Sequence, residues 1–134
     1  MDRSETRGTK LEQVRHLKGN SKGGASSHIQ VATRALDDHK AVGIVVLDLR
    51  NICDATDYFI VASGSSDTHV KALAEKVRAV LNGAGRNPHH IEGLRSGRWV
   101  LLDYVDFVVH IFHPAHRQFY NLEKLWADAP TVAV

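Results

Sequence analysis

The most hydrophobic part of the chain lies in its C-terminal third. Two apolar runs, residues 98–102 and 107–112, are separated by the four residues 103–106, and this strand–turn–strand spacing predicts a β-hairpin. Because both runs are apolar at successive positions, we expect the hairpin to be central in its sheet and covered on both faces. Pro114 is predicted to open a closing helix. The apolar face of this helix is formed by Phe119, Leu122, Leu125 and Trp126.

The upstream pattern predicts five further elements. They are a helix capped by Ser26 or Ser27, strands at residues 42–47 and 58–62, a long helix capped by Ser66, and a short strand at residues 87–91. The long helix has an i, i+3, i+4, i+7 apolar repeat and is stopped by Asn82 and Gly83. Strands that occur both in pairs and across a helix predict an α+β fold, with a mixed sheet of about five strands and helices packed over it.

Composition excludes several classes of protein. The 134 residues with 43% hydrophobic content are typical of one globular domain. No apolar run reaches the ~20 residues of a membrane span, and the N-terminal residues form no apolar signal segment. The single cysteine, Cys53, excludes an internal disulfide. We therefore expect a cytoplasmic protein that does not contact a membrane.

The N-terminal residues are basic, whereas the rest of the chain is close to neutral. Residues 1–24 hold six basic and three acidic side chains, and residues 25–134 hold 11 basic and 12 acidic ones. The basic pI therefore belongs to the N-terminal segment. We predict a polar, basic, disordered extension at residues 1–25, a domain at 26–128 and a C-terminal tail at 129–134. The extension could make a weak contact with RNA.

Three candidate sites for chemistry each have a structural alternative. The Ser63–Ser66 loop precedes a helix and could hold a nucleotide phosphate, but it lacks the P-loop lysine and a neighbouring Asp-x-Asp strand. Metal binding by the histidines His110, His113 and His116 competes with a hydrogen-bonded core role for His110. Cys53 lies near acidic residues, which raise rather than lower a thiol pKa. We expect no catalytic residue, metal or cofactor.

The hairpin turn is the strongest candidate for a binding surface. Trp99, Asp103, Tyr104 and Asp106 place aromatic rings beside carboxylates, an arrangement suited to a basic protein partner. The alternative is that Trp99 packs in the core and the aspartates only shape the turn. The pattern alone does not decide between the two.

Three motifs occurring together resemble one known family. Residues 57–66 (DYFIVASGSS) followed by His69 and Val70, residues 97–106 (GRWVLLDYVD), and VVHIF with FYNLEKLW between residues 108 and 126 are similar to the Iojap family of ribosomal silencing factors. The resemblance covers roughly residues 27–127. It implies a nucleotidyltransferase-like core that lacks catalytic carboxylates.

The resemblance also implies a function without catalysis. Members of the family bind ribosomal protein uL14 on the large subunit, sterically block joining of the small subunit and so repress translation; organellar relatives assist large-subunit assembly. Self-association of the free protein is a further expectation. The predicted partner-binding residues are Trp99, Asp103, Tyr104, Asp106, Ser63 and His69. The alternatives are a nucleotidyltransferase-like nucleotide-binding protein and a large-subunit assembly factor.

Overall fold

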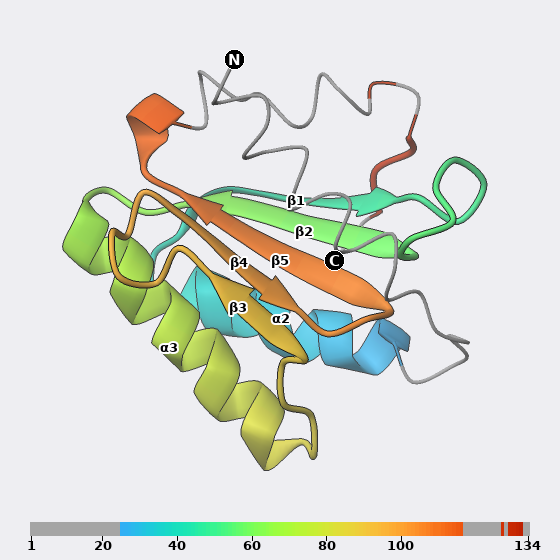
Figure 1. Cartoon of the computed structure of the whole chain (residues 1–134), viewed down its shortest axis with the longest axis horizontal. Coiled ribbons are helices and arrows are strands. Elements are labelled where there is room, and N and C mark those ends of the chain that lie inside the picture. The colour runs from blue at the N-terminus through green and yellow to red at the C-terminus, as the bar shows by residue number, and fades with distance from the viewer. Residues whose placement is uncertain (1–24, 117–126, 128, 133–134) are drawn as a thin grey trace.

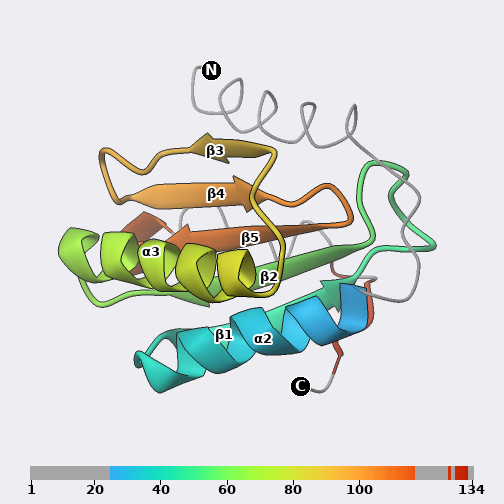
Figure 2. The same ribbon diagram turned by 90° about the horizontal axis from the view of Figure 1, so that it is seen from below.

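The protein forms a five-stranded mixed sheet with two helices on one face (Figures 1 and 2). This computed structural model describes residues 25–116, 127 and 129–132. In chain order the elements are α2 (Ala25–Asp38), β1 (Val42–Asp48), β2 (Tyr58–Ser63), α3 (Asp67–Gly83), β3 (His90–Glu92), β4 (Trp99–Asp103) and β5 (Phe107–Phe112). The predicted α+β class and mixed sheet are confirmed.

The strand order is β1-β2-β5-β4-β3, with a single parallel pair. β2 runs parallel to β5, so the crossover between them contains α3 and the β3–β4 hairpin, and the other neighbouring strands are antiparallel. β4 and β5 form the predicted hairpin, and every residue of both strands is buried. Both strands are interior in the sheet, with β5 in the middle. The expectation that the hairpin is central and covered on both faces is therefore confirmed.

Two apolar layers cover the sheet. The layer beneath α2 and α3 contains the apolar stripes of both helices and alternate residues of the strands, among them Ile60, Leu73, Val77, Leu102 and Val109. The layer on the opposite face contains Leu47, Phe59, Trp99, Leu101, Val108 and Phe112. Because side chains alternate along a strand, the continuous apolar runs in the sequence serve both layers at once.

Helix boundaries follow local chemistry in one case and not in the other. Ser66 caps α3 as predicted, since its hydroxyl oxygen accepts the backbone N–H of His69. The prediction that Ser26 or Ser27 caps the first helix is wrong, because α2 begins at Ala25 and includes both serines. The short strand was also predicted too early: β3 comprises His90–Glu92 and is defined by its pairing with β4.

Residues 130–132 pair with an edge of the sheet. The main-chain oxygen of Pro130 accepts the N–H of Asp48, and the N–H of Val132 donates to the oxygen of Val46, so this segment pairs with the outer edge of β1. The predicted domain boundary at residue 128 therefore leaves out residues 130–132, which pair with β1 in the structure. The N-terminal extension at residues 1–24 and the predicted closing helix beyond His116 lie outside the described residues. No helix in the described part is long and apolar enough to cross a membrane.

Candidate partner-binding site

The structure places the six predicted contact residues at two ends of the sheet. Asp103, Tyr104 and Asp106 form the turn between β4 and β5. Trp99 and Ser63 lie at the opposite end, where both are register partners of Phe112, one on each side of it. His69, in the first turns of α3, is at this second end. The six predicted contact residues therefore lie in two separate groups.

Most of the six residues are buried in the domain. The exposed fractions are 4% for Trp99, 0% for Asp103, 2% for Tyr104 and 5% for Ser63. The expectation that the hairpin presents Trp99, Asp103 and Tyr104 to solvent is wrong. The physical reason is that both faces of the β4–β5 hairpin carry a packed layer, so no position on these strands faces water. Asp106 has the more exposed of the two carboxylates of the turn, with a side chain that is 14% exposed and paired with Arg86.

Trp99 makes a polar and an aromatic contact in its layer. Its indole Nε1–H donates to Nδ1 of His110 over 3.0 Å, and its ring stacks on Phe112 with the centroids 5.1 Å apart. His110 is fully buried and also packs edge-on against Phe59. This confirms His110 as a hydrogen-bonded core histidine. In the described part of the chain, no three His, Cys, Asp or Glu side chains come together to hold a metal ion.

The turn at residues 103–106 has a rare backbone conformation. Val105 has φ = +78°, a value that β-branched residues almost never adopt. The N–H of Asp106 donates to the main-chain oxygen of Tyr104 across Val105 (3.0 Å). The turn is therefore a γ-turn with a positive φ at its central residue. Such turns persist only where the surrounding structure fixes them.

Hydrogen bonds from Asp103 and from the loop before β2 hold the turn in place. The Oδ1 atom of Asp103 accepts the N–H of Val105 at 2.8 Å, and the hydroxyl of Thr56 donates to the Val105 oxygen at 3.0 Å. The N–H of Asp57 donates to the main-chain oxygen of Asp106. The loop before β2 therefore fastens the turn on one side. The turn is a rigid structure, and its shape does not depend on a partner.

Arg86 fastens the other side of the turn. Its Nη2 donates to the Tyr104 oxygen at 2.8 Å and to Oδ1 of Asp106 at 2.6 Å, while Nη1 donates to Nδ1 of His28 in α2 at 3.0 Å. The guanidinium also lies 5.4 Å from the centre of the Phe107 ring. The sequence analysis missed Arg86, because an isolated arginine after a helix carries no local signal of a partner 20 residues away.

Burial changes the ionisation of two side chains of the turn. Burial raises the pKa of the Asp103 carboxyl above its ordinary value, and the hydrogen bond from Val105 only partly opposes this. Burial likewise raises the pKa of the Tyr104 phenol to about 12. Among the described residues, neither Oδ2 of Asp103 nor the Tyr104 hydroxyl has a hydrogen-bond partner. Both groups are therefore costly to bury, which indicates that they are retained for something other than stability.

The second end of the sheet is fastened by His69. The N–H of Ser65 donates to its Nδ1 (2.8 Å), so Nε2 carries the proton and donates to the main-chain oxygen of His39 at the end of α2 (2.8 Å). The N–H of Gly64 is likewise bonded to the Phe112 oxygen. Two of the backbone donors that a phosphate would need in the Ser63–Ser66 loop are thus already engaged within the protein.

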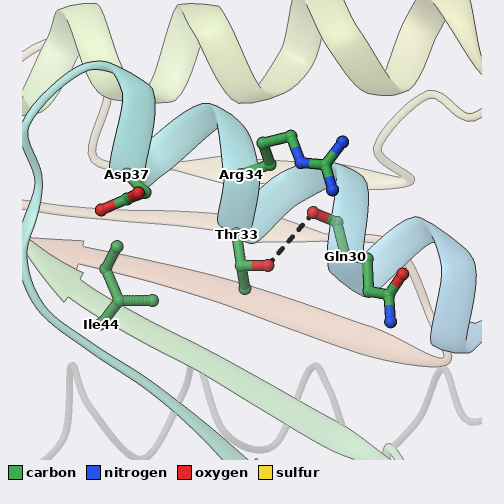
Figure 3. A pocket seen from close by; sticks show the side chains of 5 residues that line it. All are labelled: Gln30, Thr33, Arg34, Asp37 and Ile44. Carbon is green, nitrogen blue, oxygen red and sulfur yellow. Dashed lines mark hydrogen bonds between the residues drawn. The ribbon is translucent and has the colours of Figure 1, made fainter. Parts of the chain in front are cut away.

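A shallow pocket between α2 and β1 lacks the features of a small-molecule binding site. It encloses about 510 Å³ between α2 and β1 and is lined by Gln30, Thr33, Arg34, Asp37 and Ile44. Figure 3 shows Asp37 and Ile44 at one end and Arg34 and Gln30 at the other, with the Thr33 hydroxyl turned back onto the Gln30 oxygen. Its polar groups do not converge on one point, as they do in a small-molecule site.

A mixed sheet with two helices on one face and a rigid acidic turn defines a class of small α+β binding domains. Residues 23–134 match the profile of the family described as "Ribosomal silencing factor during starvation". The chain is 43% identical over 104 residues to ribosomal silencing factor RsfS of Halalkalibacterium halodurans, covering 78% of this chain and 89% of that protein. It is 42% identical to RsfS of Bacillus subtilis, with 78% and 88% covered. The protein belongs to the ribosomal silencing factor family.

Structural and more distant relatives agree with this assignment. A crystal structure of a protein from Chromobacterium violaceum superimposes with a TM-score of 0.74 at 40% identity, covering 76% of this chain and 85% of that one. A mouse relative named "Mitochondrial assembly of ribosomal large subunit protein 1" is 31% identical over 106 residues, but this chain spans only 46% of its length. The resemblance to the Iojap family seen in the sequence is confirmed, since a maize protein of that name also matches.

Proposed function

We propose that this protein binds uL14 on the large ribosomal subunit and prevents joining of the small subunit, thereby repressing translation. The observation that supports this most is the family: the chain matches almost the whole length of two bacterial silencing factors at over 40% identity. Occupancy of the joining surface is sufficient for this action, so the proposal requires no catalytic group. An interface of ~800 Å² per partner is enough for a specific complex.

The rigid turn is the part of the domain that we propose for the contact with uL14. The carboxylate of Asp106 is partly exposed there and paired with Arg86, and Asp54, in the loop that fastens the turn, is exposed. A preformed acidic surface suits a basic ribosomal protein, because no ordering cost is paid on binding. In this proposal Asp103 and Tyr104 act by positioning the turn, and Trp99 is part of the core. The contact role of Ser63 and His69, at the opposite end of the strands, stays a prediction.

Co-sedimentation tests the function directly. The protein is mixed with purified large subunits, and small subunits are added afterwards. We expect the protein to pellet with the large subunits and the yield of joined ribosomes to fall. If the protein remains in the supernatant at micromolar concentration, or pellets without reducing subunit joining, the proposed function is wrong.

A pair of charge reversals tests the proposed contact. Asp54→Lys places a cation beside the turn, whereas Asp37→Lys makes the same change on exposed α2. We expect the first to weaken binding to large subunits at least tenfold and the second to leave it within about twofold. Equal effects would show that the turn is not the contact. Sedimentation velocity of the free protein addresses the predicted homodimer in the same preparation.

A second candidate function rests on the mouse relative. Its name associates it with assembly of the large subunit, and a factor that binds uL14 could act in assembly as well as in silencing. The two functions differ in their substrate. Preferential binding to immature large-subunit particles over mature subunits would favour assembly.

A further inference from the structure

The two ends of the sheet carry different charged side chains. β2 and β5 begin, and β4 ends, at the end of the sheet that carries Asp57, Asp103 and Asp106. At the opposite end, β4 begins after Arg95 and Arg98, and α3, which follows β2, carries Lys71. Figure 1 shows the start of α3, the tip of β5 and the β3–β4 loop together at this end. The three cations Lys71, Arg95 and Arg98 are called the basic corner below.

Close packing places Lys71 against the loop that carries Arg95 and Arg98. Gly97, between Arg95 and Arg98, has φ = +72°, and a methyl group there would lie 2.6 Å from the Asp67 oxygen and 3.0 Å from Cε of Lys71. The Lys71 side chain therefore lies directly on the loop. The loop itself is closed by the bond from the Gly97 N–H to the Gly93 oxygen (3.1 Å). The basic corner is fixed by backbone packing, and only a glycine at position 97 permits it.

The cations of the basic corner are not neutralised within the described part of the protein. There, Arg50, Arg78 and Arg86 each form an ion pair with a carboxylate. No ion pair engages Lys71, Arg95 or Arg98, and both arginines are exposed. Asp67, whose main-chain oxygen lies against Gly97, has its Oδ1 4.0 Å from Nε2 of His113. The corner thus keeps a positive excess on a domain whose overall charge is slightly negative.

The chemistry of the corner fits phosphate groups spaced along a chain. Guanidinium groups bind phosphate oxygens through parallel N–H bonds, and a lysine adds a point charge. The Ser96 oxygen accepts the N–H of Arg98, so its own O–H is available to donate. Because these groups stand on an exposed loop and helix, a polyanion can pass across them with successive phosphates meeting separate cations.

We propose that the basic corner binds the phosphate backbone of RNA. The inference rests on the proposed function, because the RNA that lies within reach of a factor on the large subunit is ribosomal RNA. The domain then has two contacts of opposite sign, an acidic turn for a basic protein at one end of the strands and the basic corner for RNA at the other. Two separated contacts fix orientation as well as position.

Salt dependence of binding tests the proposal with a matched control. The triple variant Lys71→Gln, Arg95→Gln, Arg98→Gln is compared with Arg34→Gln, Lys40→Gln, Lys76→Gln, which removes three exposed cations elsewhere on the domain. Both are first checked for unchanged melting. Binding to purified large subunits is measured over a series of salt concentrations. The corner variant should bind on the order of tenfold more weakly, with the slope of log K against log salt reduced by about two to three.

The control variant should change neither the affinity nor the slope appreciably. If the two variants behave alike, the proposal is wrong while the silencing function stands, provided that wild-type protein still blocks subunit joining. If wild-type protein does not bind large subunits at all, the proposed function and this inference fail together. The two failures are therefore distinguishable.

Crosslinking identifies the class of partner. Ser96 is replaced by photoreactive p-benzoylphenylalanine, and the complex with large subunits is irradiated. An adduct that ribonuclease digests would support the proposal. An adduct that survives ribonuclease but is removed by protease would show that an acidic protein surface, and not RNA, occupies the corner, and would overturn it.

Discussion

Trp99 on β4 and His110 on β5 are diagonal neighbours on one face of the sheet, and the indole N–H donates to Nδ1 of the imidazole in a buried layer. The bond fixes the imidazole in the tautomer that carries its proton on Nε2. It also orients the Trp99 ring so that it stacks on Phe112. An aromatic residue that the sequence presents as a candidate interface anchor is in this structure part of the core.

Truncation of Trp99 is therefore expected to act on folding. Trp99→Ala should lower the free energy of unfolding by about 3–5 kcal/mol, as large-to-small changes in a core do. Trp99→Phe keeps most of the volume but removes the donor to His110 and should cost about 1–3 kcal/mol. Urea denaturation measures both. A Trp99→Ala protein of wild-type stability that no longer binds ribosomes would contradict the burial and restore Trp99 as a contact.

Arg86 should have a far larger effect on stability than other surface arginines. Arg86→Ala leaves the Asp106 carboxylate and the Tyr104 oxygen without their donor, and a loss of about 2–3 kcal/mol is expected. Arg86→Lys should recover only part of it, because one ammonium cannot reproduce the fork that reaches His28 and the turn together. Arg78→Ala is the control: its bridge to Glu75 is exposed and should contribute less than about 0.5 kcal/mol. Thermal melting distinguishes them.

The raised pKa of Asp103 predicts a pH dependence of stability. The folded-state pKa lies above the ordinary value of 3.8, so the folded state holds its proton more tightly than the unfolded state. Stability is therefore greatest below pH 3.8 as far as this group is concerned, and its contribution is lost as the pH rises through the folded pKa. Asp103→Asn should remove this component. Unfolding free energies between pH 3 and 7 test it, with exposed Asp54→Asn as the control that keeps the wild-type profile.

The raised pKa of Tyr104 predicts a loss of stability at alkaline pH. Its pKa of about 12 exceeds the ordinary value of 10.0, so stability is present below pH 10 and is lost as the pH rises toward 12. Tyr104→Phe removes a buried hydroxyl that has no partner among the described residues. The variant should be at least as stable as wild type at pH 7 and should resist alkaline unfolding at higher pH. A variant that is clearly less stable at pH 7 would show that the hydroxyl is satisfied.

Replacing Val105 in the γ-turn with glycine should stabilise the protein. Glycine adopts positive φ without the cost that a β-branched residue pays, about 1–2 kcal/mol. Val105→Gly should therefore gain up to about 1 kcal/mol, since the greater freedom of the unfolded chain offsets part of the relief. Val105→Ala, which keeps a Cβ, should not gain. Chemical denaturation of the three proteins decides the matter, and equal stabilities would mean that the strain is negligible.

The fold could be predicted from the sequence where the signal is local. β-branched runs gave β1 and β2, and the apolar repeat together with Ser66 gave α3. β3 was misplaced because it has one apolar residue, Ile91, and exists as a strand through its pairing with β4. The site could be predicted less well. Whether Trp99 faces solvent depends on what covers the sheet, and the partners of Arg86 lie in segments distant in sequence, so no spacing rule reveals either.

The pairing of Pro130 and Val132 with β1 has a consequence for biosynthesis. β1 is synthesised before the other strands, and the segment that covers its outer edge follows only after all five strands. Throughout that interval the nascent protein has an unprotected strand edge, which is a site for pairing with other chains. Neighbouring copies on one messenger RNA would meet in this state. The segment at residues 130–132 thus decides when the outer edge of β1 becomes protected from edge-to-edge association.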